Sequence, residues 1–187
     1  HDVVFVVTGE DKAVGRHLHV VPGPVKTLAV ENGIPVYQPP RLKDDPLRDA
    51  LASHEADIFV VVAYGKLIPP AIFNNPRHGT INLHPSLLPR YRGAAPVEWA
   101  LINGETGTGI TIQMINERLD AGDILLQKEI PLDSGMTAGG LYELVFPMGN
   151  AMMLEVLDSF RDGTIRPVAQ DESMATFCGK IDRDTCH

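Results

Sequence analysis

The sequence predicts an α/β fold with a mostly parallel sheet, helices on both faces and an antiparallel strand pair in its C-terminal part. Short runs of β-branched and aromatic residues alternate with helical segments over residues 1–105. Glycine and proline stand at the ends of most of these segments. Two later strand-like stretches lie close enough in sequence to be antiparallel neighbours.

Each element follows from a local pattern. Strands are predicted where apolar runs are short, at 3–7, 34–38, 57–63, 80–84, 108–115 and 123–131. Helices are predicted where apolar residues recur at helical spacing, at 24–32, 45–55, 93–103 and 136–162, with a helical turn at 69–74. Pro24 suits the first turn of its helix and Gly33 its end. Residues 8–23 follow neither period and predict a loop.

Composition narrows the class of protein. The 187 residues suit one globular domain, and 16 Lys and Arg against 24 Asp and Glu give a net charge of −8. An acidic chain does not coat nucleic acid nonspecifically, although a local basic patch can still bind RNA. No apolar run is long enough to span a bilayer, and the start lacks a signal-peptide pattern. We therefore expect a cytoplasmic protein without a membrane partner.

Two cysteines, Cys178 and Cys186, stand near the C-terminus. They do not form a disulfide framework, and a reducing compartment suits them better than secretion. A metal site is the alternative interpretation. It is the weaker one, because zinc sites normally combine close cysteine pairs with four ligands.

Asn82 and His84 stand at the end of a predicted strand. Side chains alternate along a strand, so both residues face the same side of the sheet. Ligands of α/β sheets bind beyond the carboxyl ends of parallel strands, where an amide and an imidazole can stabilise a developing oxyanion. The alternative is a buried asparagine beside a structural histidine.

Asp120 lies in the polar turn between the last two predicted strands. A carboxylate beside an imidazole would raise its pKa, orient it and relay a proton. An ordinary aspartate-rich turn is the alternative. Spacing alone does not show that His84 and Asp120 meet.

Several motifs give the chain a resemblance to the folate-dependent formyltransferase family. The segment from Asn82 to Pro89 resembles the family's Asn-x-His and Ser-Leu-Leu-Pro elements, and Leu119–Asp123 resembles its Leu-Asp-x-Gly-Asp element. Further segments narrow the resemblance to the branch that formylates tRNA: Arg90–Pro96, Pro24–Lys26, Gly33–Val36 with Gln38–Pro39, and Val62–Gly65.

The resemblance implies a Rossmann-like sheet and a reaction. A formyl group would move from 10-formyltetrahydrofolate to the α-amine of methionyl initiator tRNA. Asn82 and His84 would stabilise the oxyanion, and Asp120 would orient His84 and relay protons. The resemblance implies no metal, and we expect a monomer.

The resemblance also implies binding residues. Ser86, Leu87, Leu88 and Pro89 would contact the folate through main chain, and Tyr64 and Gly65 would line the same crevice. Contacts to tRNA would come from Lys12 and Arg16 in the loop after the first strand, and from Arg90 and Arg92. Ion pairing with acidic residues is the alternative for the last two, above all for Arg92.

Relative to the family pattern, the sequence lacks an opening strand, a glycine-rich turn, a helix and a C-terminal β-barrel domain. We therefore expect residues 1–187 to be a single catalytic domain, truncated at both ends. Alternative functions are a sugar-nucleotide formyltransferase, the hydrolase domain of a formyltetrahydrofolate dehydrogenase and, less well matched, a glycinamide ribonucleotide formyltransferase. The alternative from another class is a folate- or RNA-binding fragment without activity.

Overall fold

The computed structural model describes residues 1–14, 19–42 and 45–182. Its elements follow in the order β1 (Val6–Val7), β2 (Lys12–Val14), β3 (His19–Val21), α1 (Pro24–Glu31), β4 (Val36–Tyr37), α2 (Asp45–Ala52), β5 (Phe59–Val62), α3 (Pro70–Phe73), β6 (Thr80–His84), β7 (Arg92–Gly93), α4 (Pro96–Ile102), β8 (Gly107–Met114), β9 (Ile124–Pro131), α5 (Ala138–Arg161), the 3-10 turn η1 (Glu172–Met174) and β10 (Phe177–Cys178). Strand and helix alternate from α1 to β6. Within the described ranges, no helix is long and apolar enough to cross a membrane.

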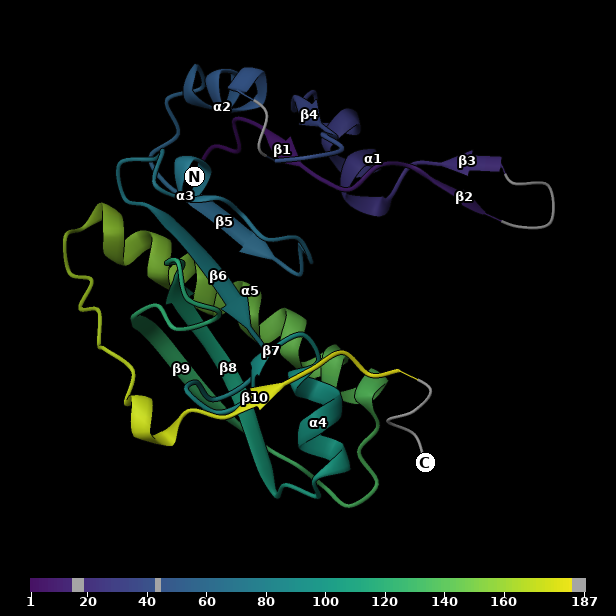
Figure 1. Cartoon of the computed structure of the whole chain (residues 1–187), viewed down its shortest axis with the longest axis vertical. Coiled ribbons are helices and arrows are strands. Elements are labelled where there is room, and N and C mark those ends of the chain that lie inside the picture. The colour runs from purple at the N-terminus through teal and green to yellow at the C-terminus, as the bar shows by residue number, and fades with distance from the viewer. Residues whose placement is uncertain (15–18, 43–44, 183–187) are drawn as a thin grey trace.

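The central sheet has four strands in the order β5-β6-β8-β9 (Figure 1). β5 and β6 run parallel, whereas β6–β8 and β8–β9 are antiparallel. The antiparallel neighbours predicted from the sequence are β8 and β9, paired from Gly107↔Pro131 to Gln113↔Ile124. The α/β prediction is thus confirmed, with a central sheet that mixes both strand directions.

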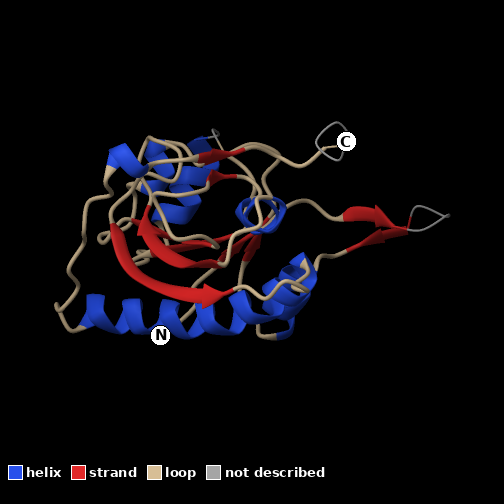
Figure 2. Ribbon diagram, turned by 90° about the horizontal axis from the view of Figure 1, so that it is seen from below, coloured by secondary structure: helices blue, strands red, loops and turns tan. Residues whose placement is uncertain are grey.

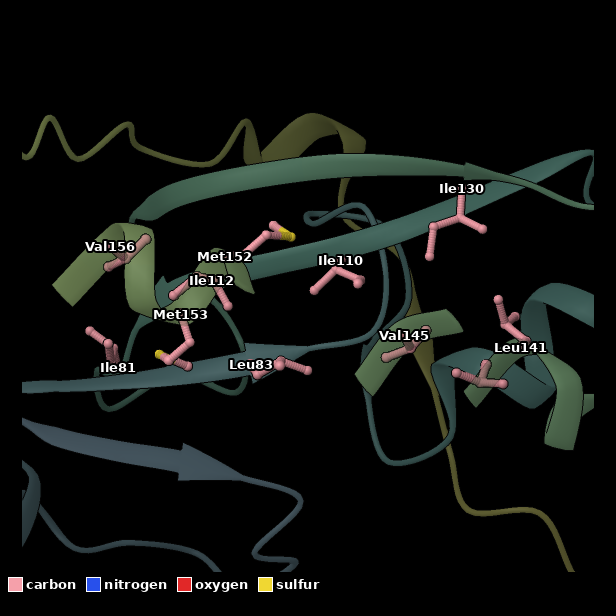
Figure 3. Close-up of a cluster of buried hydrophobic side chains, with 11 residues drawn as sticks. Ile81, Leu83, Ile110, Ile112, Ile130, Leu141, Val145, Met152, Met153 and Val156 are labelled. Atoms are coloured by element: carbon pink, nitrogen blue, oxygen red, sulfur yellow. The ribbon is translucent and has the colours of Figure 1, made fainter. Parts of the chain in front are cut away.

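One face of this sheet is apolar and packs against α5. Ile81 and Leu83 of β6 point to this face together with Ile110 and Ile112 of β8, and all four are buried. The α5 side chains that meet them are Leu141, Val145, Met152, Met153 and Val156 (Figure 3). Figure 2 shows α5 running along this side of the sheet. The alternation of β6 therefore directs Asn82 and His84 to the opposite face.

The opposite face is polar and is covered by chain from three places. Thr80 shares it with Asn82 and His84, and its hydroxyl donates to the Phe73 carbonyl at the end of α3. Residues 85–93 follow β6 and end in β7. The C-terminal strap, residues 170–178, lies beside them because β10 pairs with β7 in parallel (Figure 1). Helices thus lie on both faces, with α3 here and α5 on the apolar side.

The first part of the chain forms a separate parallel pair, β1 with β4. A second apolar cluster lies beneath it, with Leu47 and Leu51 of α2 and Ile72 of α3 buried against Phe5 and Phe59. The edge strand β5 contributes Phe59 to this cluster.

The prediction of a loop for residues 8–23 is wrong for the part that the structure describes. β2 and β3 form an antiparallel hairpin there, with Lys12↔Val21 and Val14↔His19 as partners. Figure 2 shows this hairpin projecting from the body of the molecule. Val20 and Val21 are exposed. Lys12, Ala13 and residues 19–21 are exposed, so this described part of the hairpin has no buried face. The sequence there therefore carries no period-2 alternation that would mark it as strand.

Candidate active site

His84 and Asp120 meet on the polar face of the sheet. His84 ends β6, and Asp120 lies in the turn between β8 and β9. The His84 Nδ1 atom is 3.7 Å from Asp120 Oδ2, and the two side chains are 5% and 16% exposed. The fold therefore joins two residues that spacing alone could not connect, at the carboxyl end of a parallel strand.

The second ring nitrogen of His84 fixes its orientation. Nε2 lies 2.8 Å from the Tyr91 carbonyl oxygen, which only accepts, so Nε2 carries a hydrogen and donates. Burial lowers the pKa of His84 below its usual 6.5, and the charge of Asp120 and the bond to Tyr91 only partly oppose this. The Asp120 carboxylate raises the His84 pKa, as expected from the sequence, but burial lowers this pKa by more. His84 at neutral pH is thus mainly the neutral Nε2–H form, with Nδ1 facing Asp120.

The Asp120 carboxylate has a donor at each oxygen. The Gly93 backbone N–H donates to Oδ2 over 2.9 Å, and the Gln113 side-chain amide donates to Oδ1 over 3.0 Å. Gly93 comes from β7 and Gln113 from β8. Two different strands, β7 and β8, therefore supply the donors that hold this one side chain.

Two glycines make this convergence sterically possible. A Cβ on Gly122 would overlap the Met114 carbonyl, and a Cβ on Gly93 would overlap the Cys178 carbonyl. Gly93 also has a φ of 123°, which side chains rarely adopt. The glycines of the Arg-Gly-Ala-Ala-Pro and Leu-Asp-Ala-Gly-Asp motifs are therefore required by close backbone approach at the site.

Asn82 lies on the same face as His84. Its register partner on β8 is Gln113, the residue that holds Asp120. The Asn82 side chain is half-buried, and it has no hydrogen bond to any of the residues that the structure describes. Its amide therefore has donors free for a bound molecule.

The Ser86–Pro89 loop is held tightly to the sheet. The Thr111 hydroxyl donates to the Ser86 carbonyl and accepts from the Leu88 N–H, and Gln127 donates to the Leu88 carbonyl. The Ser86 hydroxyl is used as well, on the Arg90 carbonyl. Within the described parts of the chain, the Leu87 N–H remains the backbone donor of this loop without a partner. It is therefore the main-chain donor that this segment can offer to a ligand.

Tyr64 and Gly65 follow β5 after one intervening residue, at the same sheet edge as the end of β6. The Tyr64 ring packs against the second apolar cluster, and burial raises the pKa of its hydroxyl. The hydroxyl oxygen is buried and, among the described residues, has no hydrogen-bond partner. An orphaned buried polar atom is costly, which makes it a candidate contact for a ligand.

The four basic residues of the predicted tRNA site lie in different environments. Lys12 is exposed on the β2–β3 hairpin, and Arg16 lies outside the described residues. The half-exposed Arg90 forms an ion pair with Glu105. Arg92 is only 2% exposed, and its guanidinium group is bound by residues of the C-terminal strap. For Arg92 the structure thus favours ion pairing over contact with solvent-borne phosphates.

Sequence reasoning missed three glutamines on this face: Gln113, Gln127 and Gln170. Gln113 and Gln170 are buried, and all three bond to the candidate site or its loop. The available signal was the alternation of β8, which places Gln113 on the same face as Thr111. The pairing of β8 with β6 was not readable from the sequence.

Cys178 is the only one of the two cysteines that lies in the described ranges, and it belongs to no group that could hold a metal ion there. Cys178 is buried, its Sγ donates to the Tyr91 carbonyl, and burial raises the pKa of the thiol. Cys186 lies beyond residue 182. Throughout the described ranges, no three His, Cys, Asp or Glu side chains are grouped to hold a metal ion.

The fold and this site define the class of α/β proteins that place a ligand site at the carboxyl ends of parallel strands. Residues 1–157 match the sequence profile of the family described as formyl transferase. The chain therefore belongs to the formyl transferase family.

Individual relatives agree with this assignment. The chain is 44% identical over 184 residues to a methionyl-tRNA formyltransferase of Listeria innocua, covering 98% of this chain and 59% of the relative. It is 45% identical over 185 residues to the enzyme of that name from Acidobacterium capsulatum, covering 98% and 60%. The chain thus spans about three fifths of the curated relatives it matches.

A solved structure supports the fold. A sugar 3N-formyl transferase, crystallised in the presence of dTDP and 5-N-formyl-THF, superposes with a TM-score of 0.70 at 18% identity. The match covers 94% of this chain and 59% of that one. At this identity the likeness establishes the shared architecture alone.

We predict that Gly122→Ala destabilises the protein by about 1–3 kcal/mol, because the new methyl group must displace the Met114 carbonyl. Gly135→Ala is the matched control, since a Cβ there meets open space, and it should change stability by less than about 0.5 kcal/mol. Urea denaturation measures both free energies of unfolding. Equal stability of the two variants would show that the Asp120 turn tolerates displacement.

We predict that His84 titrates below pH 6.5 and that Asp120→Asn lowers its pKa further, because the variant removes the charge that opposes burial. Histidine NMR titration, assigned with a His84→Gln variant, measures both values. The linked effect on stability has a definite sign. As pH falls, His84 becomes protonated in the unfolded chain before it does in the folded protein. The stability that its neutral form gives the fold is therefore fully present above pH 6.5 and is lost as pH falls through the folded pKa. A pKa that rises in Asp120→Asn would contradict this electrostatic arrangement.

Proposed function

We propose that the protein transfers a formyl group from 10-formyltetrahydrofolate to the α-amine of methionyl initiator tRNA. The observation that carries this proposal is the identity of 44–45% to methionyl-tRNA formyltransferases over nearly the whole chain. The placement of Asn82, His84 and Asp120 on one sheet face supports it, because acyl transfer needs donors for a developing oxyanion and a route for a proton.

The proposed roles follow from what each side chain has free. Asn82 donates its unused amide hydrogens to the formyl oxygen as negative charge develops there. Both ring nitrogens of His84 face protein acceptors, so His84 assists through the positive charge that it carries when protonated. Asp120 favours this protonation because its carboxylate lies 3.7 Å from Nδ1. Asp120 orients the ring and relays the proton that leaves the attacking amine towards the folate nitrogen.

The groups proposed to bind the folate donor are polar atoms that have no hydrogen-bond partner among the described residues. The Leu87 N–H offers one donor, and the Tyr64 hydroxyl offers a donor and an acceptor. We propose that Ser86, Leu87, Leu88 and Pro89 line this part of the site, with most main-chain groups of the loop holding its shape. Tyr64 and Gly65 line the same crevice from the end of β5.

The tRNA partner is proposed to bind through local basic residues, because the net charge of −8 disfavours broad affinity for RNA. The proposed contacts are Lys12 on the projecting hairpin, the half-exposed Arg90, and Arg16, which lies outside the described residues. Arg92 was expected to join them, but its burial supports a different role, developed below.

A sugar-nucleotide formyltransferase is the second candidate function. The motifs around Asn82, His84 and Asp120 do not separate it from the first candidate, because the resemblance gives both kinds of enzyme the same three residue types. The deciding experiment incubates the full-length protein with 10-formyltetrahydrofolate and, separately, charged initiator tRNA, an amino-sugar nucleotide, glycinamide ribonucleotide or no acceptor. Formyl-methionyl-tRNA is the expected product. Formylated sugar, formylated glycinamide ribonucleotide, free formate or no product at all would each replace this proposal with the corresponding alternative.

We predict that His84→Ala and Asp120→Ala each lower kcat by about 10²–10⁴-fold, the range for a positioned acid–base or oxyanion group. Asn82→Ala should lower kcat by about 10²–10³-fold, because it removes a hydrogen-bond donor to the oxyanion. The fold should not change, because the Asn82 side chain has no hydrogen bond to the described residues. Steady-state kinetics of the full-length protein measures these values. Near-normal turnover in all three variants would remove the residues from the reaction.

We predict that Lys12→Ala combined with Arg16→Ala raises KM for charged tRNA and reduces its salt dependence by about two phosphate contacts. The KM for folate should stay unchanged, because other segments form that site. Kinetics across a salt series tests this, with Lys128→Ala combined with Arg166→Ala, two exposed basic residues outside the proposed sites, as the charge-matched control. An unchanged KM and slope would exclude the hairpin from the tRNA contact.

A further inference from the structure

A buried polar chain connects the C-terminal strap to Asp120. Arg92 donates from Nε and Nη2 to Gln170 Oε1, over 3.0 and 2.7 Å. Gln170 Nε2 lies 3.3 Å from Gln113 Oε1, and Gln113 Nε2 lies 3.0 Å from Asp120 Oδ1. All three links lie in the interior: Arg92, Gln113 and Gln170 are 2%, 1% and 9% exposed.

The direction of this chain is fixed by chemistry. A guanidinium group has donors only, so the Gln170 atom that it binds must be the oxygen. The Gln170 nitrogen has two hydrogens, and its shorter contacts are to the Asp120 and Gly122 carbonyls, so the Gln113 oxygen at 3.3 Å can only share one of them. The Gln113 amide is oriented by the Asp120 carboxylate, which only accepts and therefore faces the Gln113 nitrogen.

Gln170 also holds the backbone of the turn. Its Nε2 donates to the Asp120 carbonyl over 2.9 Å and to the Gly122 carbonyl over 2.7 Å. Asp120 has a φ of 46°, in the left-handed region that non-glycine residues adopt infrequently. Two bonds from one buried amide therefore hold this turn in an intrinsically unfavourable conformation.

We propose that Gln113 and Gln170 are positioning residues of the site, Gln113 for the Asp120 carboxylate and Gln170 for its backbone, and that Arg92 sets the direction of the Gln170 amide. This inference rests on the proposed function for its effect on turnover. Its effect on the His84–Asp120 pair does not depend on which molecule is formylated.

The inference gives Arg92 a role that differs from the tRNA contact expected from the sequence. Its Nη1 and Nη2 atoms donate to both carboxylate oxygens of Glu172, each over 3.0 Å, and Arg118 also pairs with Glu172. Residues of the strap thus accept from four of the five N–H donors of the guanidinium group. A residue used in this way affects turnover, not the electrostatic attraction of tRNA.

The test replaces Gln113 by methionine, which is similar in length but has no donor. In the full-length protein, Gln113→Met should lower kcat by about 10–100-fold and leave KM for folate and tRNA within about twofold. Thr108→Val is the matched control, a buried polar residue on the same strand outside the chain, and its kcat should stay within about twofold. Equal losses in both variants would overturn the proposal.

The second readout is independent of activity. Loss of the Gln113 bond frees the Asp120 carboxylate to move away from His84, so the His84 pKa measured by NMR should fall further in Gln113→Met. An unchanged His84 titration would overturn the positioning role even if kcat fell. If no acceptor is formylated by the unsubstituted protein, the proposed function fails, and this titration still decides the inference.

Arg92→Lys separates the two roles of Arg92, because lysine keeps the charge but loses the planar fork. Positioning predicts a lower kcat with an unchanged salt slope and KM for tRNA. A raised KM with a changed salt slope and normal kcat would return Arg92 to the tRNA contact.

If Gln113→Met fails to fold, as judged by circular dichroism, Gln113→Glu keeps the shape and presents an acceptor to Asp120. Normal kcat in that variant would overturn the proposal.

Discussion

The Asp120 carboxylate is the contact on which the polar side of this molecule depends. Its two oxygens accept from the Gly93 backbone and from Gln113, while His84 faces it from the end of β6. These contacts join β6, β7 and β8 to the turn that carries Asp120. Displacing any one of them leaves a buried donor or acceptor without a partner, which is costly in a region with little access to water. The same contacts therefore set the geometry of the site and hold the loops against the sheet.

Much of the fold was predictable because it follows from local periodicity. The alternation of β6 correctly placed Asn82 and His84 on one face, and the antiparallel pair near the C-terminus was recognised from two nearby apolar stretches. The contact between His84 and Asp120 does not follow from local periodicity. It depends on the pairing of β8 beside β6, which no local pattern encodes, so only the resemblance to a family indicated it. Gln113 was missed for the same reason, since its partner is set by strand register.

Charged residues and short hairpins mislead sequence reasoning for physical reasons. An arginine is normally exposed, so Arg92 was assigned to a phosphate contact. Its burial is possible because Gln170 and Glu172, nearly 80 positions later, satisfy its guanidinium group. The β2–β3 hairpin was missed for the opposite reason. It buries no face, so its strands lack the alternation that burial imposes, and only backbone pairing defines them.

The C-terminal strap shows that the site extends beyond the part of the chain that defines the family. The family profile matches residues 1–157, yet Gln170 and β10 lie after that boundary. β10 pairs with β7 and brings the Cys178 carbonyl against Gly93, which excludes any side chain at that position. Gly93 in turn donates the N–H that holds one Asp120 oxygen. A piece of this protein ending near residue 157 would retain Asn82, His84 and Asp120 but lose both restraints that the strap supplies. The smallest unit that can hold the site in this geometry therefore reaches at least to residue 178.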